Sequence, residues 1–489
     1  MLVWYWDKIM FHSEKGFIKN LILYVLFASL CSFNHYFSLL FAIIVSLSGL
    51  FFIRKNKLLS YVIAGFAILL LFIPYVPIFL EQFQRKGVES WLGKPHPEFI
   101  VDYFRYVFHF SYLTVGLLLA IIAWGILQPK RPKFAWRFFF ISLCWFFTPF
   151  IIGYFYSVKV SALLQFSLLI FGFPFLLFAL FAHIRFSRQW MIATGILLIL
   201  TVNTLTLCCN RRHYSIFYQV PYEQILLETE KDFQLYGDSL TRVIDSDTNI
   251  SKYYQQTNHL KATFVRSNSF SSLAEFNHFL ANQRSPYLSF GCLASSDPVL
   301  IPLIMNYYPH LLRQVNVFLG TYYVFSKTEH PHDIQPFIIS KSLNFAELPL
   351  SNPQPGQAFL MDSNTQFSRG FELPLAEVMQ HKNNFIDITL EFYAPHALHD
   401  VAIVSQLSSH DTLIDWRSSK LNLLAQPPSS DSLQKAFLSL KLSDIYLKYP
   451  DIMLKAYVWN PAKESVLLKK LQLNTRQGNP IVYALYDRL

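Results

Sequence analysis

The chain of 489 residues lacks the cysteine pattern of a zinc protein or a disulfide-bonded protein. The spacing of its five cysteines fits neither kind of framework: Cys31, Cys144, Cys208, Cys209 and Cys292. The N-terminus also does not resemble a signal peptide, because no small-residue cleavage site follows a short apolar core. Cysteine chemistry therefore offers no guide to function.

A concentrated basic face is also missing, although the chain carries a net charge of +10. Lysine and arginine gather instead in short connectors between apolar runs, as in the cytoplasmic loops of membrane proteins. The charge distribution therefore indicates membrane lipid, and not nucleic acid, as the surroundings of the chain.

Apolar sequence is abundant, and it is unevenly distributed. Hydrophobic residues make up 53% of the chain and charged residues 15%. Apolar and aromatic residues dominate before about Thr206, whereas polar and charged residues after Asn210 reach the density of a soluble fold. We therefore expect a transmembrane domain over residues 1–209, followed by soluble domains.

The apolar stretch Leu21–Ile53 predicts two helices that reverse direction. A single straight helix of this length would run roughly 50 Å, against a hydrocarbon core of about 30 Å. Asn34 and His35 are its strongly polar residues, so we expect the reversal between Ser32 and Tyr36. Both flanks are basic, which predicts cytoplasmic flanks and places Asn34 and His35 at the outer surface.

Five more apolar runs predict the remaining spans. They cover residues 58–80, 111–127, 138–156, 163–181 and 190–207. Seven spans agree with the charge of every connector and place residues 210–489 outside the cytoplasm.

The soluble part predicts two domains. Residues 210–327 alternate strand-like and helix-like runs, which predicts a small α/β domain with a largely parallel sheet. The expected strands cover 241–245, 262–265, 287–290 and 314–325, and the expected helices cover 250–257, 272–282 and 298–308. Residues 328–357, rich in His, Pro, Asn and Gln, predict a linker. Residues 358–489 carry short strands separated by turns, which predicts an antiparallel β-sandwich.

Several stretches together resemble the bacterial GT-C membrane glycosyltransferases of the dolichyl-phosphate-mannose-protein mannosyltransferase-like superfamily. Tyr24–Leu30 followed by Asn34–Phe37 is similar to the family's Thr-His-Tyr-Phe motif between two leucine-rich spans. Other stretches resemble a helix end with its outer loop, the penultimate helix and an accessory β-domain: Ile73–Pro77 with Trp91–Pro95, Ser167–Pro174, and Val458–Asn460 with Gly478–Pro480.

The resemblance implies transfer of a sugar from a polyprenyl-phosphate donor to a glycan, lipid or protein acceptor at the outer face of a bacterial inner membrane. Such chemistry needs an acidic general base and cations that hold the lipid phosphate. The chain departs from the family because two spans and an acidic loop would precede Met1, and because Ser167 and Leu168 replace Arg-Tyr. We expect either the C-terminal part of a longer enzyme, which the aromatic start Leu2–Phe11 favours, or a chain without its catalytic machinery.

Five residues are candidates for binding the substrate. His35 and Asn34 could hold the donor phosphate or an acceptor, but a polar residue at a turn also serves solvation. Lys94 beside Trp91 could pair with a phosphate, although a lysine that snorkels next to an interfacial tryptophan is the more common arrangement. Lys159 lies in the predicted outer turn before the penultimate helix and is a further candidate for phosphate contact.

The catalytic residue stays unassigned from sequence. Four acidic residues fall in one predicted outer loop, where solvated charges are the favoured interpretation: Glu81, Glu89, Glu98 and Asp102. Asp245–Asp247 could bind a divalent cation, but turn formation and helix capping are favoured there. No cofactor is therefore assigned.

A second function hypothesis is a non-catalytic, membrane-anchored protein that binds a glycan or another envelope component. The missing acidic loop and Ser167 favour it. A transporter is a weaker hypothesis, because the spans lack internal repeats and carry few charges at mid-membrane depth.

Overall fold

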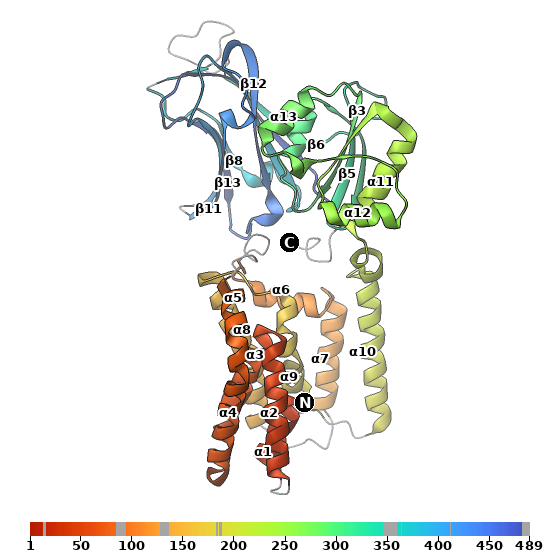
Figure 1. Ribbon diagram of the computed structural model, residues 1–489, viewed down its shortest axis with the longest axis vertical. Coiled ribbons are helices and arrows are strands. Elements are labelled where there is room, and N and C mark those ends of the chain that lie inside the picture. The colour runs from red at the N-terminus through yellow and green to blue at the C-terminus, as the bar shows by residue number, and fades with distance from the viewer. Residues whose placement is uncertain are drawn as a thin grey trace. The chain divides into compact units, whose positions relative to one another are not determined.

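The computed structural model divides the chain into two compact units (Figure 1). Unit 1 comprises Met1–Arg211 and unit 2 comprises Arg212–Leu489. The boundary falls two residues beyond the predicted end of the transmembrane domain. The structure describes residues 1–12, 16–84, 94–127, 136–181, 184, 188–345, 359–362, 364–410 and 412–481.

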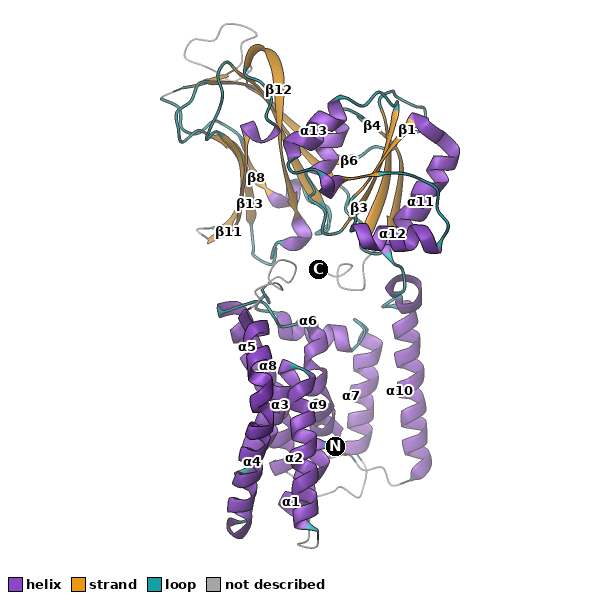
Figure 2. Ribbon diagram, viewed as in Figure 1, coloured by secondary structure: helices purple, strands orange, loops and turns teal. Residues whose placement is uncertain are grey.

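Unit 1 is helical in its described residues (Figure 2). Its α-helices are α1 (Leu2–Phe11), α2 (Phe17–Asn34), α3 (Tyr36–Gly49), α4 (Leu58–Phe72), α5 (Val76–Gln84), α6 (Phe99–Val107), α7 (Tyr112–Ile126), α8 (Trp136–Lys159), α9 (Phe173–Phe181) and α10 (Gln189–Cys209). A 3-10 segment, η3 (Phe166–Phe171), precedes α9. Each predicted span coincides with one of these helices or with a broken helix.

Several of these helices are suited to a membrane. By length and composition, four segments among the described residues can cross one: 17–34, 55–81, 136–159 and 189–209. The pair α6 and α7, bent by 82° at their junction, is a fifth candidate. Large apolar side chains of α4, such as Leu59, Phe66 and Leu70, are exposed. Such contiguous apolar surface is typical of a membrane protein, because lipid covers it.

Helix α1 packs into unit 1 through aromatic side chains. Trp6 is almost fully buried, and its ring centroid lies 5.0 Å from that of Trp145 in α8. Leu2, Ile9 and Met10 are buried as well. The aromatic start of the chain therefore belongs to the core of unit 1.

The predicted reversal in Leu21–Ile53 is present. Helix α2 ends at Asn34, and α3 begins at Tyr36. His35 between them has extended backbone angles, and its imidazole accepts a hydrogen bond from the backbone N–H of Phe37. A side chain that accepts such a bond satisfies one of the free N–H groups at a helix start. The polar residue thus fixes the point of reversal.

The first part of unit 2 is a mixed sheet with helices. Its strand order is β2-β1-β3-β5-β4. The elements are α11 (Pro221–Tyr236), β1 (Leu240–Ile244), α12 (Thr248–Thr257), β2 (Val265–Arg266), α13 (Leu273–Ala281), β3 (Tyr287–Leu293), α14 (Leu300–Met305), β4 (His310–Val317) and β5 (Gly320–Ser326). β1 pairs in parallel with β2 and β3, whereas β5 is antiparallel to both β3 and β4.

Two sequence predictions about this sheet need correction. The run 314–325 is not one strand, because the chain turns between β4 and β5 at Leu319, which has a φ of 59°. The sheet is therefore only partly parallel. The capping predicted at Asp245–Asp247 is present, because Asp247 accepts N–H groups at the start of α12. Ser272 likewise caps α13 by accepting the N–H of Glu275.

The rest of unit 2 contains two antiparallel sheets. One has the order β11-β10-β13-β8 and the other the order β12-β9-β14-β6, with β7 also paired to β14. The strands are β6 (Phe337–Asn344), β7 (Phe359–Met361), β8 (Phe371–Pro374), β9 (Phe385–Ala394), β10 (Ala402–Ser409), β11 (Thr412–Lys420), β12 (Ser429–Lys441), β13 (Ile452–Trp459) and β14 (Val466–Arg476). Buried side chains of both sheets form one apolar core that includes Ile403, Leu454, Ile388 and Leu471.

The predicted linker 328–357 contains a strand. Residues 337–344 form β6, which pairs with β14 at the edge of its sheet. Side chains along β6 alternate between partly buried and exposed, as expected for an edge strand with one face on the core. The surrounding polar residues concealed this short alternation.

Candidate functional site

Asp102 in α6 is the most deeply buried of the acidic candidates. The residue is 3% exposed, and each carboxylate oxygen has a cationic or imidazole partner. Oδ2 lies 3.1 Å from His96 Nε2, and Oδ1 lies 3.0 Å from Arg105 Nη1. The partners reach solvent, with side-chain exposures of 33% for His96 and 50% for Arg105. A buried carboxylate is thus linked to the surface through two groups that can bind an anion.

An aromatic cluster holds α6 in place. Phe99 and Tyr103 lie on the same face of α6 as Asp102, and both are buried. Their rings approach Phe166 in η3, at 4.8 Å and 6.0 Å between centroids. Phe37 in α3 belongs to the same cluster. The cluster therefore brings α6, η3 and the turn between α2 and α3 to one end of unit 1.

A second set of polar contacts secures the bend between α6 and α7. His109 and Phe110 both adopt the left-handed conformation, with φ of 57° and 54°. His109 Nδ1 lies 2.9 Å from the Thr206 hydroxyl of α10, and the Arg211 guanidinium lies 3.9 Å from the Tyr106 ring centroid. These contacts compensate for backbone strain at two non-glycine residues.

His35 is exposed beside this cluster. Its ring centroid lies 5.9 Å from that of Phe171 in η3, and its Nδ1 caps α3. Asn34, the last residue of α2, is also exposed. The structure thus shows a local, helix-capping role of His35.

The two cations predicted to bind phosphate, Lys94 and Lys159, have different surroundings. Lys94 is exposed, two residues before His96 and the start of the Asp102 site. Lys159 ends α8, and its ammonium lies 5.8 Å from the ring centroid of Phe155 in the same helix. Trp91 lies outside the described residues. Of the predicted substrate-binding residues, His35 and Lys94 therefore adjoin α6 or its cluster, while Lys159 contacts its own helix.

The interpretation of Asp102 as a solvated loop charge was wrong. Phe99, Asp102 and Tyr103 have the spacing of one helix face, and Arg105 follows three residues after Asp102. That amphipathic pattern was the signal for a buried acid on a short helix. Glu81 is exposed and Glu98 is partly buried, while Glu89 lies outside the described residues.

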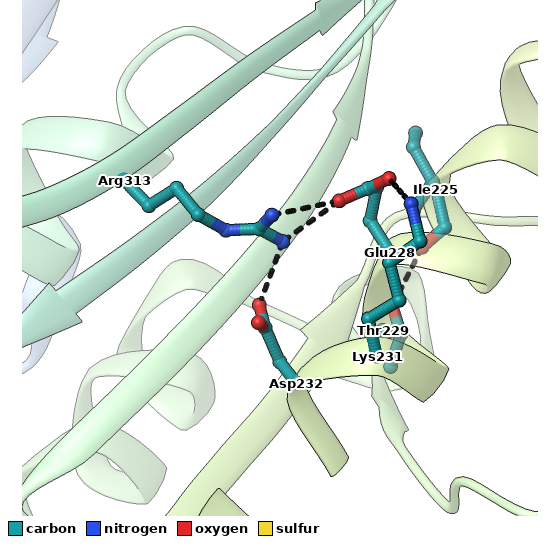
Figure 3. Close-up of polar contacts among 6 residues, drawn as sticks. All are labelled: Ile225, Glu228, Thr229, Lys231, Asp232 and Arg313. Atoms are coloured by element: carbon teal, nitrogen blue, oxygen red, sulfur yellow. Dashed lines mark hydrogen bonds and ion pairs between the residues drawn. The ribbon is translucent and has the colours of Figure 1, made fainter. Parts of the chain in front are cut away.

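A different carboxylate network joins α11 to β4 in unit 2 (Figure 3). Both terminal nitrogens of Arg313 donate to Glu228 Oε2 at 2.8 Å, and Nη2 also donates to Asp232 Oδ2 at 3.1 Å. Burial raises the pKa of Asp232, against the opposing effect of Arg313. Burial would also raise the pKa of Glu228, but hydrogen bonds from Lys231 and Arg313 outweigh it and lower that pKa. Glu228 and Asp232 of α11 both bind Arg313 of β4, so the network holds this helix against its sheet.

A third buried carboxylate, Asp387 in β9, is 1% exposed. It accepts hydrogen bonds from Arg476 Nε at 2.9 Å, from Arg476 Nη2 at 3.3 Å and from the Ser439 hydroxyl at 2.7 Å. All three residues belong to strands of one sheet. The site is closed to solvent, because Arg476 is 5% exposed.

A cavity of about 110 Å³ in unit 2 lies beside the end of β3. Its polar lining groups already have partners within the chain: Ser296 donates to Asp245, Lys441 donates to the Ala294 carbonyl, and Asn479 donates to the carbonyls of Val317 and Gly320. Burial raises the pKa of the Cys292 thiol in its wall to about 12, so this thiol is no nucleophile near neutral pH. The cavity is therefore better explained as a packing gap.

Metal binding finds no support in the described part of the chain, where no group of three or more His, Cys, Asp or Glu residues is arranged to hold an ion. In Asp245–Asp247, the carboxylate of Asp247 accepts the N–H groups of Asn249 and Ile250. Helix capping thus accounts for Asp247.

Comparisons with known proteins give little guidance. No family model and no curated protein matches the chain. Two solved structures show slight similarity. A mutant VP2 protein of infectious bursal disease virus is 11% identical over 41% of this chain and 52% of its own, with a TM-score of 0.16. The dimeric latent PorU from Porphyromonas gingivalis is 12% identical over 33% of this chain and 16% of its own, with a TM-score of 0.14. Similarity at this level carries no argument about fold or function.

Proposed function

We propose that the chain is a GT-C-like membrane glycosyltransferase, or the C-terminal portion of one. It transfers a sugar from a polyprenyl-phosphate donor to an extracytoplasmic acceptor, and its seven spans lie in a bacterial inner membrane. The observation that carries the proposal is the buried Asp102 between His96 and Arg105, on a helix whose cluster also holds the turn at His35. The site combines an acid, a strong cation and two imidazoles at one end of the apolar helices.

The proposed chemistry assigns roles to Asp102, Arg105, Lys94 and His35. The oxygen of an acceptor hydroxyl forms a bond to the anomeric carbon of the donor sugar, and the bond from that carbon to the phosphate oxygen breaks. Asp102 accepts the hydroxyl proton as polyprenyl phosphate leaves. Arg105 and Lys94, both solvent-exposed, bind the phosphate, and His35 orients the donor or the acceptor.

The test is transfer by the purified chain in proteoliposomes that contain polyprenyl-phosphate hexoses and a panel of acceptors. Asp102→Asn keeps the shape of the side chain but removes its basicity, so turnover should fall about 10²–10⁴-fold. Donor binding should change little. Glu81→Gln, at an exposed acid of the same unit, is the matched control and should leave turnover unchanged. Equal turnover in Asp102→Asn and the unmodified chain would exclude Asp102 as the base.

The second candidate function is a membrane-anchored protein that binds a glycan or another envelope component without catalysis. It is favoured by the compactness of unit 2, a β-rich body distinct from the helical unit. The same proteoliposomes separate the two functions. Absence of transfer with every donor, together with binding of an envelope glycan by the intact chain, would favour the binding protein.

A further inference from the structure

The four-stranded sheet β11-β10-β13-β8 has one face on the core and one face turned away from it. Core-facing positions alternate along its strands and include Ile403, Leu407, Leu454 and Val458. Because neighbouring residues of a strand point to opposite faces, Gln406, Tyr457 and Trp459 lie on the other face. Trp416 of β11 pairs with Gln406 and shares that face. Figure 1 labels β8, β13 and β11 of this sheet.

Aromatic rings cover this outer face. The Trp416 and Trp459 ring centroids are 6.3 Å apart, with the rings at 81° to each other, and Trp416 is 44% exposed. Phe367, 55% exposed, lies 5.9 Å from the ring of Tyr457. Between these flanking rings, β10 presents the small side chain of Val404, which is fully buried although it points away from the core. The rings therefore lie over the central strand, and Trp416 and Phe367 keep much of their surface open to solvent.

Charges on this face are paired with one another. Lys455 lies beside Gln406 on the neighbouring strand, and its ammonium is 2.7 Å from a carboxylate oxygen of Glu372 in β8. In β11, Lys420 pairs with Ala402 of this face, and its ammonium is 3.0 Å from a carboxylate oxygen of Asp400. A polyanion or a strongly charged protein gains little from cations that already have carboxylate partners. The charge pattern therefore favours a neutral partner.

One polar group at the centre of the aromatic surface has no partner. The indole N–H of Trp459 is buried and makes no hydrogen bond. A buried donor without an acceptor is unfavourable, so an added acceptor at this position is favourable. The amide of Gln406, opposite Trp416 in the register of the sheet, supplies a donor and an acceptor on the same face.

We propose that the aromatic face formed by Trp416, Trp459, Tyr457, Phe367 and Gln406 binds a neutral glycan. A hexose has an apolar C–H face that stacks on an indole ring and a rim of hydroxyl groups. Those hydroxyls bond to the Gln406 amide and accept from the Trp459 N–H when the Trp416 ring turns aside. The inference rests on the proposed binding role of unit 2 and is independent of transfer at Asp102, so the two can fail separately.

The experiment titrates the intact chain in detergent micelles with neutral oligosaccharides, namely gluco-, manno- and galacto-oligomers of four to six units. Tryptophan fluorescence and saturation-transfer NMR report the binding. We expect saturable binding of at least one neutral oligomer. Trp416→Ala should raise its Kd at least about tenfold, whereas Trp416→Phe should retain most of the affinity. Tyr253→Ala removes an aromatic ring of α12 that is 60% exposed and is the matched control, with an unchanged Kd.

Several outcomes would overturn the proposal. One is the absence of binding across the neutral panel, and another is equal binding by Trp416→Ala. Self-association that Trp416→Ala abolishes would assign the face to a second copy of the chain. A tryptophan fluorescence change of the intact chain that depends on Trp416 and follows addition of phosphatidylcholine without oligosaccharide would assign it to lipid. Thermal unfolding of Trp416→Ala, measured in parallel, confirms that the variant is folded.

Discussion

Asp102 in unit 1 and Asp387 in unit 2 are both nearly inaccessible to water, yet their surroundings differ. Asp387 is enclosed by Arg476 and Ser439, and its main partner, Arg476, is also buried. Asp102 has partners that extend to solvent. An ion pair in which both partners are buried, such as Asp387 with Arg476, can exchange a partner only when the domain opens. An ion pair with a solvent-exposed partner, such as Asp102 with Arg105, can exchange that partner for a ligand. Burial of an acid alone therefore does not distinguish a structural from a functional site, but the exposure of its partners does.

The largest effect on stability should come from breaking the buried ion pair between Asp387 and Arg476. Arg476→Met leaves Asp387 as a buried charge with one hydroxyl partner, so the free energy of unfolding of unit 2 should fall by about 3–5 kcal/mol. Urea titration of the full chain, followed by tryptophan fluorescence, measures this loss. The double variant Asp387→Leu with Arg476→Met should recover most of it, because no charge stays buried. A loss below about 1 kcal/mol in the single variant would mean that the pair opens easily, and the contrast with Asp102 would disappear.

The network of Glu228, Asp232 and Arg313 should show an intermediate effect that depends on pH. Because the pKa of Glu228 is lowered in the folded state, its contribution to stability is present above its unfolded pKa of about 4.5 and is lost as pH falls through the folded value. Asp232 acts in the opposite sense, because its pKa is raised. Glu228→Gln should therefore be less stable at neutral pH and lose less stability between about pH 5 and pH 3.

Thermal unfolding of the full chain at a series of pH values measures how much stability Glu228→Gln and the unmodified chain each lose as the pH falls. Glu329→Gln, at an exposed acid of the same unit, serves as the control and should follow the unmodified chain. If Glu228→Gln also follows the unmodified chain at acid pH, the ion pair contributes nothing to the pH dependence.

The smallest effect on stability is expected at the open site. Arg105 is half exposed and His96 still contacts Asp102 in its absence, so Arg105→Met should lower the melting temperature less than Arg476→Met does, by the equivalent of about 1 kcal/mol. The same variant should weaken binding of a polyprenyl-phosphate donor to proteoliposomes clearly, because a phosphate partner is lost. A destabilisation as large as that of Arg476→Met, with unchanged donor binding, would make Asp102 a structural acid like Asp387.

The sequence predicted local features where one residue determines the structure. His35 interrupts an apolar stretch, and its ring caps the helix that follows. Asp247 and Ser272 cap the helices predicted to begin beside them. Such features depend on neighbours within a few residues, which a sequence pattern contains.

Features that depend on distant partners were missed. The face of α6 that carries Asp102 packs through Phe99 and Tyr103 into a cluster that includes Phe146, Phe166 and Leu169, which are far away in the chain. Strand β6 is defined by pairing with β14, more than a hundred residues later. Similarly, the break between β4 and β5 lies within a run rich in strand-forming residues, and the antiparallel pairing of Val317 with Gly320 defines the turn between them. The surroundings of an acidic residue thus depend on tertiary contacts, and the difference between Asp102 and Asp387 lies in those contacts.

The bend of 82° between α6 and α7 has a geometrical consequence for access. If α7 crosses a bilayer, a helix almost perpendicular to it lies nearly parallel to the plane of the bilayer. All residues of α6 then share a similar depth. A lipid-linked molecule that diffuses within the leaflet would meet Asp102 and Arg105 by lateral approach, without leaving the membrane. Its search is then two-dimensional, and the surface density of the lipid, not its bulk concentration, sets the encounter rate.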